Sequence, residues 1–314
     1  MMFNKLQYYI KNMFLDLMPS AFFSKNKKKS SLNIKERIDY YNQLSETYNL
    51  GKPHKLSKPY FLTDTVSIAE FKRPKKLKTY YFDLMETLRF FPETDQFCYE
   101  FGDITEVPYQ PTFVKSRPIE GDNTNAVLLK LNKIRHFKFV KDNRRFLDKK
   151  DMLIGRSRFY HYHHNKVDFY NKYFNHPMCD LGAVNSPEVS AEWSTPKLSI
   201  KEHLKYKFVL SLEGNDVATN LKWIMSSNSI AVSPKLKYET WFMEGTLIPD
   251  VHFICIKDDY SDLEEKLQYY IEHPDKALKI IENANKHVKQ FNNLKKERAV
   301  AFGVVDKYFT LQER

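Results

Sequence analysis

Cysteine is scarce in this sequence, and the few thiols lie far apart. The 314 residues contain only Cys98, Cys179 and Cys255, and no CxxC pair occurs. A disulfide-rich scaffold or a cysteine-based zinc module needs closely spaced cysteines, so we expect neither. The thiols are expected to be reduced, as in a cytoplasmic protein.

The sequence also lacks the run of about 20 apolar residues that a membrane-spanning helix needs. Near the N-terminus apolar residues recur at helical spacing, but Lys5, Lys11 and Asp16 interrupt them, and a basic run follows at 25–29. This pattern predicts an amphipathic helix rather than the core of a signal peptide. The helix either lies on an anionic membrane surface or docks on the protein's own core.

Common nucleotide and nucleic-acid signatures are missing as well. Neither GxGxxG nor GxxxxGK[ST] occurs, which argues against dinucleotide oxidoreductases and P-loop enzymes. No RNP, KH or zinc-finger pattern is present, and the aromatic residues form core-like stripes instead of alternating with lysine. We therefore expect no nucleic-acid partner.

Apolar residues and positive charge are plentiful. Hydrophobic residues make up 42% and aromatic residues 15% of the chain, enough for a folded core. The length suits one large or two medium domains. Lysine and arginine number 50 against 39 acidic residues, a net charge of +11 that favours anionic partners.

A very polar stretch at 141–151 marks the best candidate boundary within the chain. Before it, the spacing predicts helices at 34–46 and 76–91 and short strands at 97–101 and 111–114. After it, strands and helices alternate, which predicts a parallel α/β domain. The expected strands are 152–154, 178–184, 208–212, 230–232 and 252–256, and the expected helices are 164–174, 199–206, 217–225, a helix opened by a Ser261–Glu264 capping box, and one restarting at His273-Pro274.

The segment 208–223 has the pattern most typical of an anion site. A buried strand enters a tight turn and then a helix, which an aspartate is placed to cap. The first helical amides would face the carboxyl end of the strand, where α/β sheets bind ligands and helix N-termini favour phosphate. An ordinary turn between a strand and a helix is the alternative. The candidate phosphate-binding residues are Gly214, Asp216, Val217, Ala218, Thr219, Asn220 and Lys222.

Two further segments place charged residues at strand ends. Gly155 is followed by Arg156 and Arg158, and two arginines there either clamp a diphosphate or remain solvated. Asp103 follows Gly102 at the end of another expected strand, a position suited to a general base or to an ordinary turn.

The histidine-rich segment 161–164 invites a metal interpretation. Histidines two and three residues apart can share an ion, but no nearby carboxylate or cysteine set completes a site. We expect no metal.

Several stretches resemble glycosyltransferase family 90, which includes the capsule-associated and protein O-glucosyltransferases. They are 214–223, 229–232, 241–245 and 249–252, and the similarity extends over roughly residues 75–290. The stretches 101–104, 113–118 and 173–182 resemble more specifically the bacterial branch, the lipopolysaccharide A proteins.

This resemblance implies a GT-B architecture, in which two Rossmann-like domains face a cleft, with extra N-terminal helices and a C-terminal helix. The expected parts are a basic amphipathic segment (1–30), an acceptor-side domain (31–150), a domain that binds the nucleotide sugar (151–290) and a C-terminal helix (291–314) that packs back on the first domain. The resemblance also implies inverting transfer from a UDP-sugar without an obligatory metal or other cofactor.

The resemblance further implies roles for individual residues. The turn from Gly214 to Lys222 would hold the diphosphate, although Asn220 stands where the family usually has arginine. Gly155 matches a family turn, with the positive charge supplied by either Arg156 or Arg158. The remaining donor-side candidates are Lys166, at a position that is basic in the family, and either Glu239 or Glu244 for the ribose hydroxyls.

On the acceptor side, the resemblance makes Asp103 the general base. Lys115 and Arg117 lie nearby in sequence and either meet acidic groups of the acceptor or are solvated loop charges. The bacterial resemblance implies a lipopolysaccharide or lipooligosaccharide core, or a related surface glycan, as acceptor. The net charge of +11 and the basic N-terminal helix suit a cytoplasmic enzyme that is peripheral on the inner face of the inner membrane. The alternatives are the same fold acting on capsule or protein, and a non-enzymatic basic module that binds membrane or nucleic acid.

Overall fold

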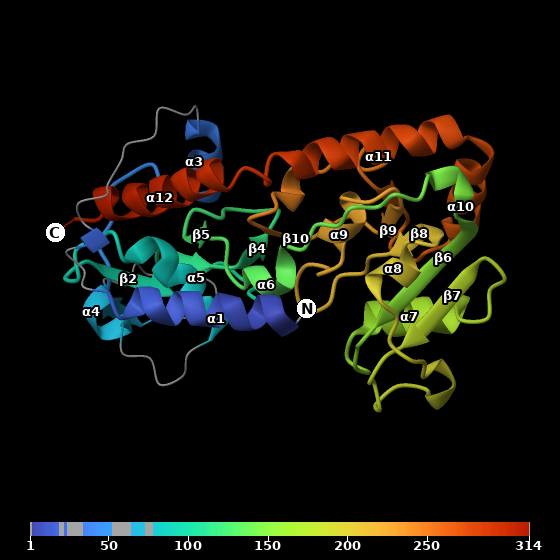
Figure 1. Cartoon of the computed structure of the whole chain (residues 1–314), viewed down its shortest axis with the longest axis horizontal. Helices are drawn as coiled ribbons and strands as arrows, with labels where there is room; N and C mark the ends of the chain where they lie inside the picture. Colours follow the sequence, from blue (N-terminus) through green and yellow to red (C-terminus); the bar gives the residue numbers. More distant parts are fainter. Residues whose placement is uncertain (1, 19–21, 24–33, 52–63, 73–77, 314) are drawn as a thin grey trace. The chain divides into compact units, whose positions relative to one another are not determined.

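The computed structural model describes residues 2–18, 22–23, 34–51, 64–72 and 78–313. The basic run at 25–29 lies outside the described residues. The chain divides into two compact units (Figure 1). Unit 1 comprises Met1–Arg135, Tyr238–Trp241 and Asn293–Arg314, and unit 2 comprises His136–Lys237 and Phe242–Asn292. The first change of unit therefore precedes the polar stretch at 141–151, within the short helix α6 (Lys133–His136).

Unit 2 is built on a five-stranded parallel sheet, which confirms the predicted α/β class. The strand order is β11-β9-β8-β6-β7. Every residue of the central strand β8 is buried, as expected for a parallel strand covered on both faces. The strands are β6 (Lys150–Ser157), β7 (Cys179–Ala183), β8 (Tyr206–Leu210), β9 (Ile230–Ser233) and β11 (Ile254–Cys255).

Three of the helices predicted in unit 2 begin within one residue of the predicted position, and two begin later. Helix α7 begins at the predicted residue, and Pro274 occupies the first position of α11, where its missing N–H costs nothing. The capping box was wrong, because Asp262 precedes α10 and the Ser261 hydroxyl donates to Asp259. The bounds are α7 (His164–Tyr173), α8 (Ile200–His203), α9 (Leu221–Met225), α10 (Leu263–Glu272) and α11 (Pro274–Lys289).

The strand order creates a switch point in unit 2. From β6 the chain crosses to β7 on one side, and the next strand, β8, lies on the other side of β6. Ligands of open α/β sheets bind at such a point, beyond the carboxyl ends of the two strands. A β-carbon at Gly155 of β6 would lie 2.9 Å from Leu181 and 3.1 Å from Leu210, so this glycine lets the three strands pack closely.

Unit 1 holds a four-stranded sheet in the order β1-β2-β3-β5, in which β1 is antiparallel to β2 and the other pairings are parallel. A separate two-stranded ladder joins β4 to β10. The strands are β1 (Thr65–Ser67), β2 (Gln96–Tyr99), β3 (Thr112–Val114), β4 (Ser116–Pro118), β5 (Ala126–Leu128) and β10 (Tyr238–Thr240), and the helices are α1 (Met2–Asp16), α3 (Lys35–Tyr41), α4 (Ile68–Phe71), α5 (Thr79–Leu88) and α12 (Leu294–Leu311).

The last helix, α12, completes unit 1 by packing on α3 and α5 (Figure 1). A β-carbon at Gly303 would lie 2.2 Å from Ile38, so glycine permits the close contact between α12 and α3. Glu297 of α12 accepts hydrogen bonds from Arg37 at 2.6 Å and from Lys130 at 2.8 Å. Glu297 thus pairs with one cation from near the start of the chain and with another from its middle.

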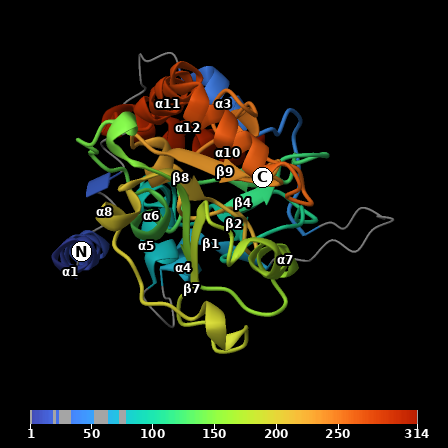
Figure 2. The ribbon, with the colours of Figure 1, turned by 90° about the vertical axis from the view of Figure 1, so that its right-hand side faces the viewer.

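The predicted N-terminal helix is confirmed as α1, and one of its faces docks on unit 1. Helix α1 runs beside α5 (Figure 2). Its Tyr8 hydroxyl donates to Asp83 of α5 at 2.5 Å, and the Tyr9 ring packs edge-on against Phe82 with the ring centroids 5.7 Å apart. No helix within the described residues is both long and apolar enough to span a membrane.

Candidate active site

The loops after β6 and β8 meet at the switch point of unit 2. The imidazole of His163, the residue before α7, contacts the Asn215 side chain at 3.0 Å. The Asn165 amide donates to the Glu213 carbonyl at 2.9 Å. Lys166 Nζ lies 3.6 Å from the point that a β-carbon on Gly214 would occupy. The structure therefore brings Lys166 and the Gly214 turn together.

Hydrogen bonds define the state of His163. Its Nδ1 accepts from the Tyr160 backbone N–H at 3.1 Å, so the proton resides on Nε2, which donates to Asn215. Burial, followed by the nearby charge of Lys166, lowers the pKa of His163. At neutral pH the side chain is thus an uncharged donor beside a lysine ammonium.

Aromatic rings extend this region along the segment between β6 and α7. The Tyr160 and Tyr162 rings stack with centroids 5.3 Å apart. The Arg158 guanidinium lies 5.3 Å from the Tyr160 ring centroid, and Arg158 is exposed. These groups add a flat apolar surface and a second positive charge next to α7.

The structure distinguishes the two arginines that the sequence left open. Arg156 donates to the Asp180 carbonyl at 2.7 Å and also pairs with the Asp180 carboxylate. Burial alone would raise the pKa of Asp180, but the Tyr206 hydroxyl and Arg156 lower it. Burial and that carboxylate raise the pKa of Tyr206 to about 12. Arg156 therefore links β6 to β7, whereas Arg158 lies beyond the strand.

The turn that follows Gly214 differs from its predicted form. Helix α9 begins at Leu221, and Asn220 rather than Asp216 is its N-cap residue. The Asn220 amide donates to the Leu210 carbonyl at 2.8 Å, which holds the turn against the end of β8. The predicted helical amides therefore lie in the turn before a five-residue helix. Of these residues Val217 and Ala218 are buried, like Asp216, and Thr219 is half-buried.

Three other predicted donor-binding residues form buried ion pairs. Lys222 has no exposed surface, pairs with Glu244 at 2.6 Å and lies over the Phe242 ring. Glu239, on β10 of unit 1, accepts from Arg117 at 2.8 Å. Neither glutamate exposes more than 4% of its surface. All three side chains are therefore held in the interior by their ion-pair partners, and none of them extends toward solvent.

The predicted base lies in unit 1, in a loop that a buried lysine holds in place. Gly102 adopts φ +133°, a conformation that favours glycine, and places Asp103 after β2. Lys115 Nζ donates to Asp103 Oδ1 at 2.6 Å. The Lys115 side chain is 1% exposed, whereas that of Asp103 is 29% exposed. The carboxylate is thus anchored from within and still reaches solvent.

Lys115 and Arg117 are not the solvated loop charges of the alternative interpretation. Arg117 is fully buried and, besides pairing with Glu239, donates to the carbonyls of Ala126 and Tyr40 at 3.0 and 2.8 Å. It joins β4, β5 and β10 and presents no surface to an acceptor.

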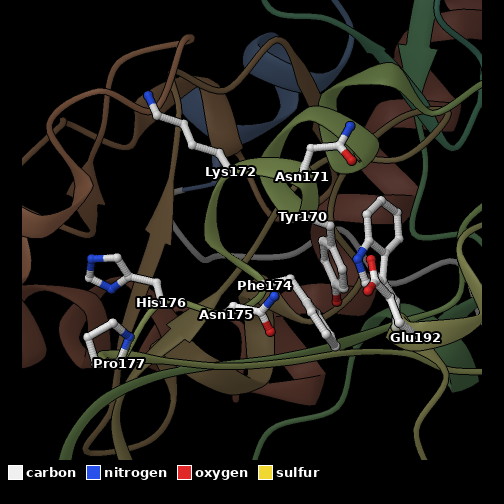
Figure 3. Close-up of a pocket in the computed structure, with 9 residues that line it drawn as sticks. Tyr170, Asn171, Lys172, Phe174, Asn175, His176, Pro177 and Glu192 are labelled. Carbon is white, nitrogen blue, oxygen red and sulfur yellow. The ribbon is translucent and has the colours of Figure 1, made fainter.

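A separate cavity of about 340 Å³ lies at the other end of α7 (Figure 3). It is lined by the second half of α7, the residues that follow it, and the 3-10 turn Ala191–Trp193. Its lining residues are Tyr170, Asn171, Lys172, Phe174, Asn175, His176, Pro177, Glu192 and Trp193. The cavity does not include His163 or Lys166.

The histidines at 161–164 do not converge. His161 contacts Glu188 at 2.9 Å, whereas His163 contacts Asn215. Among the described residues, no group of three or more His, Cys, Asp or Glu side chains is arranged to hold a metal ion.

Comparison with known proteins agrees with the family resemblance. A family model described as Glycosyl transferase family 90 matches residues 141–313, more than half of the chain. The chain is 39% identical over 322 residues to O-glucosyltransferase LpsA of Dichelobacter nodosus, covering 99% of this chain and 96% of that protein. The chain belongs to glycosyltransferase family 90. Membership in this family favours an enzyme over a non-enzymatic binding module.

This family 90 glycosyltransferase is also similar, over shorter stretches, to two more distantly related proteins. It is 32% identical over 84 residues to Protein O-glucosyltransferase 2 of Danio rerio, which is 26% of this chain and 16% of that protein. It is also 32% identical over 108 residues to Uncharacterized protein 179R of Invertebrate iridescent virus 6, 31% of this chain and 9% of that protein.

Sequence reasoning missed His163, Asn165 and Asn215 as members of this site. The sequence pattern suggests His163 only as a metal ligand. Its position between an expected strand and an expected helix was the available signal, because that connection in a parallel α/β domain leads to the carboxyl edge of the sheet.

Proposed function

We propose that this glycosyltransferase moves a hexose from a UDP-sugar to a hydroxyl of a lipopolysaccharide or lipooligosaccharide core, or of a related surface glycan, with inversion of configuration. The observation that carries the donor assignment is the meeting of His163 and Lys166 with the Gly214 turn at the switch point of unit 2. Glycosyl transfer itself follows from the family.

The donor diphosphate lies against the Gly214 turn in this proposal. The absence of a side chain at Gly214 lets an oxyanion approach the backbone, and Lys166 and the Nε2–H of His163 are close by. Arg158 supplies a second positive charge, and the stacked Tyr160 and Tyr162 rings offer a face for the uracil. These cations stabilise the charge that grows on the leaving diphosphate and do so without a metal.

Asp103 acts as general base in the proposed reaction. It takes the proton of the acceptor hydroxyl, and that oxygen attacks the anomeric carbon on the face opposite UDP. The new glycosidic bond forms as the bond to the diphosphate oxygen breaks, and UDP leaves with the bonding electron pair. Lys115 holds the carboxylate during this step. The reaction requires the GT-B arrangement, in which the domain with the base faces the domain with the donor.

The names of two relatives suggest the first sugar to test. Both the Dichelobacter nodosus protein and the Danio rerio protein are O-glucosyltransferases. We therefore expect UDP-glucose to be the preferred donor among UDP-hexoses.

A protein acceptor is the second candidate, because the Danio rerio relative is named for protein glucosylation. The bacterial relative aligns over nearly the whole chain, which favours its class of acceptor. Assays that offer core oligosaccharide and folded protein in parallel would distinguish the two.

The donor assignment is tested by ligand-induced thermal stabilisation, since a ligand that binds only the folded state raises Tm. We expect UDP to stabilise the protein more than GDP, CMP, NAD or ATP, with no change on adding EDTA. Lys166→Met should weaken UDP binding by about tenfold or more, because it removes a charged phosphate contact. Lys172→Met, near the other end of α7, is the matched control. Equal UDP affinity in wild type and Lys166→Met would contradict the assignment.

A further inference from the structure

Helix α1 has two faces with different surroundings. The docked face lies against unit 1, where Tyr8 bonds to Asp83, Asn12 is buried and Asp16 pairs with Arg89 at 3.2 Å. These contacts fix the rotation of α1 about its axis. What the rest of its surface presents is therefore determined by the structure.

The apolar part of that surface is exposed, and two of its residues, Met13 and Leu17, also border a cavity beside α5. The large side chains of this apolar part are between 49% and 84% exposed. At 3.6 residues per turn they fall within about 100° of the helix circumference, which makes them one continuous stripe. We call this set the apolar stripe: Leu6, Ile10, Met13, Phe14 and Leu17.

The exposed positions outside α1 differ from the stripe. Leu147, Leu278 and Leu294 are also 45% to 70% exposed, but each lies in a different element, whereas the stripe gathers four side chains of α1 and that of Leu17, the residue that follows it. Scattered apolar residues are normal on a protein surface, and contiguous ones mark an interaction surface.

The sequence around the stripe is strongly basic. Residues 1–30 contain six lysines and a single acidic residue, Asp16. That carboxylate is turned toward Arg89 on the docked face, whereas Lys5 and Lys11 are exposed. An exposed apolar surface in a positive field is complementary to an anionic, amphiphilic partner.

We propose that the apolar stripe inserts into the interface of an anionic lipid bilayer, with α1 lying parallel to the membrane plane. The apolar side chains enter the boundary between headgroups and acyl chains, and the lysines meet lipid phosphates. The docked face of α1 then ties unit 1 to the surface. Pairing with a second copy through the stripe is disfavoured, because it would bring two basic N-terminal segments together.

Vesicle flotation tests this surface directly. Wild type should float with vesicles of phosphatidylcholine containing about one-third phosphatidylglycerol and bind them less at high salt, while binding pure phosphatidylcholine weakly. The triple variant Ile10→Ser/Phe14→Ser/Leu17→Ser should lower the partition constant at least about tenfold. A triple variant of isolated exposed leucines, Leu147→Ser/Leu278→Ser/Leu294→Ser, should bind as wild type does.

A second variant keeps the apolar stripe and removes two positive charges from α1. Lys5→Gln/Lys11→Gln should weaken binding to the anionic vesicles while leaving the helix docked, and it remains informative if the serine variant misfolds. Equal partitioning of all variants would overturn the proposal, and so would a wild type that binds neither vesicle. A dimer in solution that the serine variant dissociates would assign the stripe to a second copy instead. None of these outcomes depends on the donor or the acceptor.

Discussion

Units 1 and 2 assemble their buried ion pairs from very different distances along the chain. Two pairs in unit 2 with both side chains buried join residues 7 and 22 positions apart. Two such pairs in unit 1 join residues 122 and 260 positions apart. The pairs in unit 2 are Lys149–Asp142 and Lys222–Glu244, and those in unit 1 are Arg117–Glu239 and Arg37–Glu297.

This difference shows that the two proposed halves of the active site depend on different parts of the chain. The donor site of unit 2 arises from consecutive β-α elements between β6 and α9. The loop of the base rests on β3 and β4, and β4 pairs with β10, which comes after most of unit 2. Helix α12, the last element of the chain, packs on α3 and α5 and completes unit 1. A destabilising substitution near the end of the chain should therefore disturb the loop that carries the base before it disturbs the donor site.

The most disruptive change should be Glu297→Leu on α12. It leaves Arg37, Lys130 and the Trp241 indole N–H without their common acceptor. Removing one member of a buried charge network costs about 5 kcal/mol at the upper end. We expect hydrogen exchange to rise in unit 1 first. The matched control is Glu282→Leu, which removes an exposed glutamate of α11 and should leave exchange unchanged. Equal protection of unit 1 in both variants would refute this dependence.

A smaller loss is expected from Lys222→Met in unit 2. It strands the buried Glu244 carboxylate and should lower the free energy of unfolding by about 3 kcal/mol. The double variant Lys222→Met/Glu244→Leu should recover most of the stability measured by urea unfolding. If the pair is structural, the double variant still binds UDP. Loss of UDP affinity in a stable double variant would instead indicate that Lys222 binds the diphosphate.

The smallest effect concerns pH and should be confined to unit 2. Burial lowers the pKa of His203. Burial is also the main reason why the pKa values of His163 and His252 are lowered. A lowered pKa in the folded state means that the unfolded chain takes up the proton first. Stability is therefore full above the unfolded value of about 6.5 and declines as pH falls below it. Tm measured from pH 7 to 5 should fall less in His203→Asn than in the exposed-site control His161→Gln.

The sequence predicts much of unit 2, because its signals are local. The strand before Gly155, the helix from 164 and the restart at Pro274 each follow from neighbouring residues. The approach of Lys166 to Gly214 follows from parallel topology, which brings successive strand ends to one edge.

The remaining features depend on contacts with residues outside the motif itself, which its local spacing does not encode. Nothing near Arg117 or Glu239 predicts their contact across the β4–β10 ladder. The position of Lys222 after the Gly214 turn predicts a phosphate ligand, but in the structure it forms a buried ion pair with Glu244. The turn at 217–220 is a third case. The Asn220 side chain donates to the Leu210 carbonyl, and the helix begins at Leu221 instead of residue 217.

The most direct test of the proposed division, with the base on unit 1 and the donor on unit 2, is sugar transfer and UDP binding measured together in Asp103→Asn. The account predicts that kcat falls at least about 100-fold, because the general base is lost. UDP should still raise Tm as it does in wild type. Asp122→Asn, an exposed carboxylate of unit 1, should keep both properties. Turnover near the wild-type level in Asp103→Asn would contradict the account.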